Sequence, residues 1–436
     1  MGIQNFPVAL QAIIQQGYLE REFHEAIQPE LTFRQVAERT EFPGQIGETI
    51  TRTRTGLKAP VSTPLNPSTN TNLDNGLSPA GWTAEQYSLA INMYGDTIDL
   101  NMVTTRVGIE EQFTTNAKVN GVQAGQSVDR LARAALYTAY HGGNTFVSIT
   151  STTTSIAVPN INGFDKVFSN GVMVPVSNAN PLAVLLNGNA YSVVGAVADV
   201  TNTSYSASFG GRSGVLTLST AASGGDGTAG NPLVSSVAPA VIRPNARASS
   251  FALQSGDFLK MAQLEDAVTV LRNQKAPLIN GKYNIYLDPT SMRQLYADTD
   301  FQTLYRGAYG SSEYKQFDIT EFLDMRFIRT VEAPQGTNGT RLVHRPLVCA
   351  GGALVEGWFE YTGYSDIPDM DNAWTSVTGG IAQVVRPPLD RLGQIIAQSW
   401  YYIGGFVVPT DITSNPTIIP TTSNAAFKRA VVIEHS

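Results

Sequence analysis

Histidine and cysteine are the residues through which this sequence could most readily perform acid–base, nucleophilic or metal chemistry. It has four histidines and one cysteine: His24, His141, His344, His435 and Cys349. The histidines are scattered along the chain. A zinc site needs several such ligands at short spacing, and a histidine base needs a serine or cysteine nucleophile motif. Neither pattern occurs. We therefore expect the histidines to have no catalytic role and to lie on a helix surface, at a helix C-terminus, in a strand and in the tail. We expect a small buried hydrophobe for Cys349, with no intrachain disulfide.

One glycine-rich segment matches a nucleotide-binding pattern. Gly225–Gly230 reads GDGTAG, which fits GxGxxG. A dinucleotide site requires a strand before this turn and a helix after it, so that the helix N-terminus meets the pyrophosphate. Asn231 and Pro232 follow instead, with no helical pattern, so the segment is predicted to be a flexible loop. We expect no cofactor.

Clustered carboxylates could hold a hard cation or act as acids. Asp366, Asp369 and Asp371 lie close in sequence but lack the glycine and distal glutamate of an EF-hand. A solvated loop is the favoured interpretation, with a structural ion as the alternative. Asp288 directly precedes Pro289, which is typical of a helix cap. We therefore predict no catalytic residue and no metal site.

The one positive stretch in the extended segment 44–81 contains Arg52, Arg54 and Lys58. It could contact DNA, or it could form ion pairs with an adjacent acidic subunit. The whole chain has 29 Lys+Arg against 36 Asp+Glu and a net charge of −7, which argues against a protein that grips a nucleic-acid backbone. We therefore favour these three residues as inter-subunit contacts.

Composition bounds the class of protein. Charged residues make up 15 % of the 436 residues, against about 25 % in ordinary soluble domains. This shortfall indicates that other subunits cover much of the surface. The N-terminus lacks the pattern of a secretory signal, and the long uncharged stretch Val167–Ala198 is interrupted by Pro175 and Pro181, so we expect no membrane span.

The first two regions are predicted to be an arm and a loop. Residues 1–43 are expected to be helical, with one helix after Pro7 and a second starting at Thr32, where Thr32 and Gln35 form a capping box. Residues 44–81 contain an alternating strand pattern with little to bury on either face, followed by many prolines. We interpret them as a hairpin-like extended arm that lies over a neighbouring subunit.

The next two regions differ sharply in composition. Residues 82–143 are predicted to contain a strand at 87–100 and a helix from about 110 to 140, ended by His141-Gly142-Gly143. Residues 144–247 have only seven charged residues, and short apolar runs such as 190–194 and 214–218 are separated by Asn, Gly and Ser. We interpret 144–247 as an inserted antiparallel β domain.

The last two regions return to mixed α/β. In residues 248–385 we predict a helix capped by Ser255, a strand at 282–287 and a helix opened by Asp288-Pro289. In residues 386–436 an apolar strand at 395–408 is expected to pair with the 87–100 strand. The fold class is therefore α+β.

The order of these regions resembles the major capsid protein of tailed phages, the Hong Kong-97-type fold. The segments that carry the resemblance are Leu77–Asp96, Ser127–Arg133, Tyr283–Pro289 and Pro388–Gly393. They are similar to the passage from extended loop to peripheral domain, the end of the spine helix, a strand-to-helix step of the axial domain and the lead into the last peripheral strand. Residues 144–247 lie outside the resemblance.

The resemblance implies a non-enzymatic shell protein of the virion, assembled in the host cytoplasm from hexamers and pentamers around double-stranded DNA that it does not read. It also implies a portal, a separate scaffolding protein, because the arm is too short to include a fused one, and in some relatives decoration proteins. Two alternatives remain open: a cellular nanocompartment shell of the same fold, and a phage tail or fibre protein.

Overall fold

The structure is a computed structural model. It describes residues 21, 23, 25–27, 31–42, 49–62, 64, 81–82, 84–101, 112–199, 211–306, 321–338, 341–359, 374–386, 395–411 and 413–436. The chain divides into two compact units, each made of separate segments. The first comprises Met1–Ile50, Ser88–Arg133 and Leu354–Val407, and the second comprises Thr51–Tyr87, Ala134–Ala353 and Val408–Ser436.

A six-stranded sheet forms the centre of the first unit. Five strands follow the order β1-β20-β23-β22-β21, and β4 also pairs with β23: β1 (Ala37–Phe42), β4 (Asn92–Asn101), β20 (Leu354–Phe359), β21 (Trp374–Thr378), β22 (Ile381–Arg386) and β23 (Ile395–Val407). β4 and β23 run antiparallel, from Asn92 opposite Gly404 to Asn101 opposite Ile395. This confirms the predicted pairing. The expected 87–100 strand is divided, because β3 (Ala84–Ala90) pairs with β2 (Thr49–Thr55) instead.

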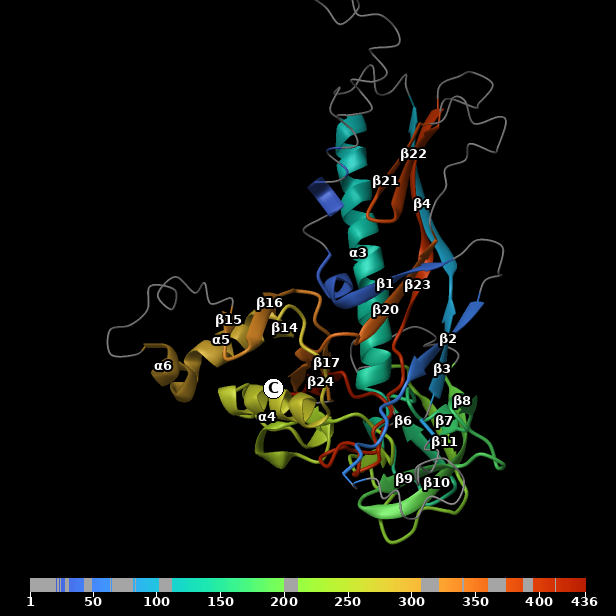
Figure 1. The fold of residues 1–436 in the computed structure, drawn as a ribbon, viewed down its shortest axis with the longest axis vertical. Helices are drawn as coiled ribbons and strands as arrows, with labels where there is room; N and C mark the ends of the chain where they lie inside the picture. The colour runs from blue at the N-terminus through green and yellow to red at the C-terminus, as the bar shows by residue number, and fades with distance from the viewer. Residues whose placement is uncertain are drawn as a thin grey trace, which may run out of the picture. The chain divides into compact units, whose positions relative to one another are not determined.

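The long predicted helix is present as α3 (Gln112–Tyr140). Figure 1 shows it running alongside β4, β21 and β22. Its buried Ala124 and Val128 pack with side chains of the first unit: Phe23, Ile27, Ile381, Trp400 and Tyr402. Gly121 is required at this contact, since a Cβ there would lie 2.9 Å from the Phe23 carbonyl oxygen. As predicted, a glycine with positive φ follows the helix, Gly143 at 75°.

The predicted helix at Thr32 is wrong. Residues Phe33–Val36 form a single 3₁₀ turn, and the chain continues as β1, which pairs in parallel with β20. Thr32 makes no side-chain cap, because its hydroxyl donates to Asp129 Oδ2 at 2.8 Å and the Thr32 and Arg34 amides donate to Asp129 Oδ1. Asp129 of α3 thus satisfies the amides that a capping box would otherwise serve. The helix predicted after Pro7 lies outside the described residues.

The second unit contains a six-stranded antiparallel sheet whose strands all lie between Asn144 and Ser235. Their order is β5-β12-β9-β10-β11-β6: β5 (Asn144–Phe146), β6 (Ser155–Val158), β9 (Leu182–Leu186), β10 (Asn189–Ala198), β11 (Gly214–Leu218) and β12 (Pro232–Ser235). A separate hairpin joins β7 (Lys166–Ser169) to β8 (Val172–Pro175). The strands predicted at 190–194 and 214–218 are confirmed within β10 and β11. The sheet has its own apolar core, which includes Ile156, Val184 and Leu216.

A mixed sheet forms the other part of the second unit. Its order is β13-β24-β19-β14-β16-β15: β13 (Val241–Ile242), β14 (Tyr283–Leu287), β15 (Glu321–Phe322), β16 (Met325–Arg329), β19 (Leu347–Cys349) and β24 (Ala430–Ile433). A two-stranded ribbon, β17 (Gln335–Thr337) with β18 (Leu342–His344), accompanies it. Buried Cys349 lies in β19, as expected for a small hydrophobe. Short 3₁₀ turns occur at Pro244–Ala246 and Ser250–Ala252.

Three helices belong to this part: α4 (Met261–Asn273), α5 (Pro289–Ala297) and α6 (Thr299–Arg306). They share one core with β14, β16, β19 and β24. The predicted Asp288 cap is confirmed, since its side chain accepts the Thr290 and Ser291 amides. The predicted Ser255 cap is wrong: α4 begins at Met261, whose amide donates to Asp298 Oδ2 at 2.9 Å. Among the described helices, none combines the length and apolar character needed to cross a membrane.

Candidate functional site

The three predicted contact residues occupy two different settings. Arg52 and Arg54 lie on β2, where exposure alternates, so that Ile50 and both arginines are half-buried while the threonines face outward. Lys58 is exposed in the segment after the strand. The expectation that this strand has little to bury is therefore wrong. The structure separates Lys58 from the two arginines, which lie on the inner face of the β2–β3 ribbon.

The partner strand supplies buried groups on the same ribbon. Glu85 of β3 is only 3 % exposed, and the Gln86 amide donates to the Gly171 carbonyl at 3.1 Å, between β7 and β8. The alternation of β3 places Glu85, Tyr87 and Leu89 on its more buried side. The ribbon is therefore anchored by its inner face and presents threonines on its outer face.

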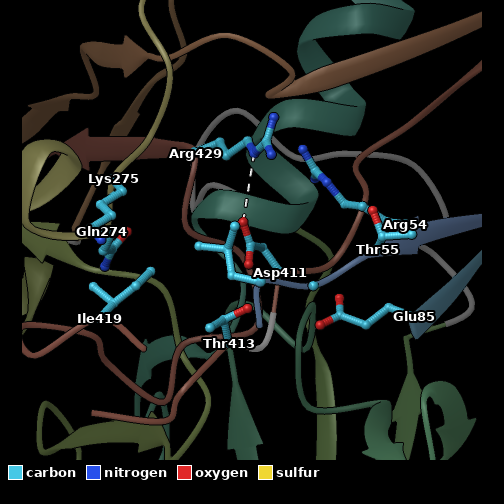
Figure 2. Close-up of a pocket in the computed structure, with 11 residues that line it drawn as sticks. Arg54, Thr55, Glu85, Gln274, Lys275, Asp411, Thr413, Ile419 and Arg429 are labelled. Carbon is cyan, nitrogen blue, oxygen red and sulfur yellow. Dashed lines mark ion pairs between the residues drawn. The ribbon is translucent and has the colours of Figure 1, made fainter. Parts of the chain in front are cut away.

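A small pocket of about 140 Å³ opens at the end of β2. Its walls come from β2 and β3, the end of α4 and the C-terminal loop: Arg54, Thr55, Gly56, Leu57, Glu85, Gln274, Lys275, Asp411, Thr413, Ile419 and Arg429. Figure 2 shows the Arg54 and Arg429 guanidinium groups pointing toward the same part of the pocket, with Asp411 beside them. Arg429 Nε lies 3.7 Å from Asp411 Oδ2. Of the three predicted contact residues, Arg54 lines this pocket, and Arg52 and Lys58 do not.

Large apolar side chains are exposed on the segments next to the ribbon. Leu57 is 49 % exposed, Val61 85 % and Trp82 58 %. Leu57 and Val61 lie four residues apart in one exposed segment, and Trp82 lies shortly before β3. Neighbouring exposed apolar side chains mark an interaction surface more often than an isolated one does. We define these three residues and Lys58 as the arm surface.

Several buried polar centres escaped prediction from sequence. Ser291 Oγ lies 2.7 Å from His435 Nε2 and donates to Asp288, and His344 Nδ1 lies 2.9 Å from Asp288 Oδ2. The residue types resemble a nucleophile constellation, but Asp288, Ser291 and His435 are fully buried. Burial and the neighbouring His344 charge also lower the His435 pKa to about 3, too low for a base at neutral pH. This cluster is structural.

A second buried centre surrounds Glu434. Arg243 Nε donates at 2.7 Å, Arg345 Nε at 3.0 Å, and His141 Nε2 lies 2.8 Å away. Burial alone would raise the pKa of Glu434, but the charges of Arg243, His141 and Arg345 outweigh it and hold that pKa well below the ordinary value. The only sequence signal was the apolar run Val431–Ile433 directly before Glu434, which indicates a buried strand.

A third centre, in the first unit, surrounds Glu356 of β20. Arg34 Nε donates to both carboxylate oxygens at 3.0 Å, and Tyr402 Oη donates at 2.9 Å. Arg39 Nε lies 3.6 Å away on a side chain that is 55 % exposed. Arg34 also donates to the Gly379 carbonyl. The centre therefore joins β1, β20, β23 and the β21–β22 turn.

The remaining candidates from the sequence are the glycine-rich segment, the aspartate group and His24. Gly225–Gly230 is a loop between β11 and β12, as predicted, and its Asp226 accepts hydrogen bonds from Asn189 and Tyr191. Asp366, Asp369, Asp371 and His24 lie outside the described residues. Within the described ranges, no group of three or more His, Cys, Asp or Glu is arranged to hold a metal ion.

Comparison with known proteins gives the fold. No protein-family model and no curated protein matches the sequence. Among solved structures, the capsid of Ralstonia phage GP4 matches with a TM-score of 0.50 and 11 % identity, over 92 % of this chain and 87 % of that one. The capsid of cyanophage Pam1 matches with a TM-score of 0.49 and 8 % identity, over 95 % and 92 %. The match to the Ralstonia phage GP4 capsid shows that the chain has the fold of a phage capsid protein.

Proposed function

We propose that this protein is the major capsid protein of a tailed phage and assembles into an icosahedral shell around double-stranded DNA. The observation that carries the proposal is the fold match to the Ralstonia phage GP4 capsid, which spans 92 % of the chain. The net charge of −7 supports a shell that holds DNA without adhering to it. The protein acts by building an enclosure rather than by catalysis.

We assign the parts of the chain as follows. Residues 1–43 are the N-terminal arm, 44–81 the extended loop, 82–143 the peripheral domain with α3 as its spine, 144–247 an inserted β domain and 248–385 the axial domain. The β4–β23 pairing supports joining 82–143 to the strand in 386–436. The pairing of β24 with β19 favours placing the last residues with the axial domain. The pairing of β20 with β23 favours ending the axial domain near Ala353.

The physical basis of assembly is burial of the arm surface on a neighbouring copy. Exposed apolar area gains about 25 cal/mol per Å² when it is removed from water. That gain must exceed the cost of ordering the loop and of lost subunit freedom. Leu57, Val61 and Trp82 are the side chains that would supply it. Lys58, between them, would pair with a carboxylate of the neighbour.

A particle experiment tests this function. The purified protein, alone and with a scaffolding protein from the same genome, is imaged by electron microscopy, and the nucleic acid in particles from infected cells is quantified. We expect closed icosahedral shells that contain double-stranded DNA. Shells that enclose protein cargo would instead identify a nanocompartment, and elongated trimers would identify a fibre protein. Either result contradicts the proposal.

A deletion isolates the role of the loop. Replacing residues 57–80 by a short Gly-Ser linker retains β2 and β3, so the subunit should keep its fold by circular dichroism. We expect the variant to form no shells. Shells of normal size and yield would contradict the role given to the arm surface. A separate experiment, copurification with shells assembled from the unaltered protein, would identify the portal, scaffolding and decoration partners.

A further inference from the structure

The pocket at the end of β2 contains hydrogen-bond donors that the described chain does not use. Arg54 Nη1 is buried and has no hydrogen-bond partner among the described residues. Arg429 Nε also has no hydrogen bond there, and its ion-pair partner Asp411 lies 3.7 Å away. A buried guanidinium donor left unpaired is costly. We propose that this pocket binds the carboxylate side chain of a second copy of this chain, held by Arg54 and Arg429. The proposal rests on the proposed function, because it specifies one contact between assembled subunits.

The charges around the pocket leave room for one more anion. Arg54, Lys275 and Arg429 line it together with the carboxylates Asp411 and Glu85. Lys428, just behind, donates to the Thr413 carbonyl at 2.7 Å. Burial lowers the pKa of Lys428, while the Asp411 and Glu85 charges act in the opposite direction. Lys428 is therefore close enough to compensate those carboxylates, and the positive charge of the pocket remains in excess.

Size and geometry select the kind of anion. The pocket measures about 140 Å³, well below the roughly 300–1,000 Å³ of pockets that enclose drug-sized ligands. A carboxylate group fits, and a guanidinium fork matches it well. A nucleic-acid phosphate carries its sugars and flanking nucleotides, whose bulk a pocket of about 140 Å³ disfavours. A protein side chain is therefore the better occupant.

The composition of the chain and the position of Leu57 favour a copy of this chain as the source of the carboxylate. The chain has 36 Asp+Glu against 29 Lys+Arg, so each copy has more carboxylates than cationic side chains to offer a neighbour. Leu57 lines the pocket and is also part of the arm surface, with 49 % exposure. A partner that covers this apolar side chain therefore also covers the mouth of the pocket. The apolar contact and the ion pair would form together.

The first test compares three variants in assembly without nucleic acid. R54Q removes the charge, R54K retains it without the fork, and K166Q removes a charge from an exposed site on β7 as the matched control. We expect R54Q to raise the protein concentration needed for shells about tenfold or more, the range for a lost charged hydrogen bond. R54K should fall between R54Q and the unaltered protein, and K166Q should have no effect.

The results separate the two proposals. If R54Q and K166Q assemble like the unaltered protein, the pocket proposal is overturned while the proposed function stands. If the unaltered protein forms no shells even with its scaffolding protein, both the function and this contact are contradicted. Hydrogen exchange of the unassembled subunits shows whether R54Q has kept the native fold.

Cross-linking identifies where the carboxylate comes from. R54K subunits labelled with ¹⁵N and unlabelled subunits are assembled together and treated with a carbodiimide, which joins a lysine amine to a nearby carboxylate. We expect linked peptides of mixed isotope content that contain position 54 and an Asp or Glu of another copy. Links only within one chain, to Glu85 or Asp411, would overturn the proposal.

Discussion

The buried carboxylates Glu434 and Glu356 show two ways to neutralise a charge away from water. Glu434, in the second unit, has two buried guanidinium partners within 3.0 Å, Arg243 and Arg345, and a third close contact with the His141 ring. Glu356, in the first unit, has one fully buried cation, Arg34, and takes its other close hydrogen bond from the neutral Tyr402. We therefore expect the loss of unfolding free energy on neutralising a buried carboxylate to depend on how many buried cations remain without a counter-charge.

The largest effect is expected for E434Q. Two guanidinium groups that are at most 9 % exposed would lose their counter-ion, so we expect the second unit to lose about 4–5 kcal/mol of unfolding free energy, the upper end for a broken buried ion pair. Hydrogen exchange should accelerate in peptides from β13, β19 and β24. E265Q, an exposed position on α4, is the control. Unchanged hydrogen exchange in E434Q would contradict the expectation that the buried cations around Glu434 need its charge.

E356Q should have a smaller effect, confined to the first unit. Only Arg34 would remain buried without a counter-charge, and its contact with the Gly379 carbonyl would persist. We expect a loss of about 3 kcal/mol, the lower end of the same range. The same exchange measurement should detect faster exchange in β1, β20 and β23. A loss equal to that of E434Q would show that cation number does not decide the cost.

Acid should act through His435, the neighbour of Glu434. Its ring is stacked on that of His344 and contacts Ser291, which in turn contacts Asp288. The His435 pKa is lowered from 6.5 to about 3 in the fold. Below pH 6.5 the imidazole therefore binds a proton in the unfolded state but stays neutral in the folded state. Stability therefore falls with pH between 6.5 and 3, by about 2 kcal/mol at pH 5.

Urea unfolding at pH 7.5 and pH 5 measures this loss, and H435Q should reduce it because glutamine does not titrate. The pKa values of Glu434 and Asp288 are lowered in the fold. Their loss of stability therefore falls mainly at more acidic pH, around and below the ordinary carboxyl pKa of about 4. An equal pH dependence in H435Q and the unaltered protein would assign the loss to another group.

The smallest effect is expected at the exposed pair of Arg272 and Asp324, whose side chains are 56 % and 54 % exposed. Solvent screens such a pair, so R272Q should change the unfolding free energy by less than about 0.5 kcal/mol, and salt should abolish the difference. Urea unfolding at low and high salt checks this. A loss as large as that of E356Q would mean that burial is not what separates these ion pairs.

Structural elements could be predicted from the sequence where the pattern was local, or where two apolar segments could pair with each other. The periodicity of α3, the Asp288 cap and the pairing of β23 with β4 follow from such patterns. The start at Thr32 failed because a cap motif cannot reveal that Asp129, far away in sequence, takes its amides. The buried charges failed for the same reason, since Glu434 meets Arg243 and His141 only after folding.

The candidate site likewise has a part that could be predicted from the sequence and a part that could not. Alternation in residues 49–55 was enough to predict a strand with Arg52 and Arg54 on one face. It could not show that the arginine face turns inward, because that depends on β3 and on the loop that carries Asp411. The pocket joins Arg54, Lys275 and Arg429 from three distant segments, and no spacing within the sequence encodes such a meeting.

The ladder between residues 92–101 and 395–404 sets an order for biosynthesis. A ribosome completes β4 long before it reaches β23, so the pairing edge of β4 stays open while the intervening chain is made. The sheet between Asn144 and Ser235 draws all its strands from consecutive chain and can close during that interval. An open strand edge invites aggregation. The edge of β4 is therefore open to such pairing until residues 395–404, near the end of the 436-residue chain, have been made.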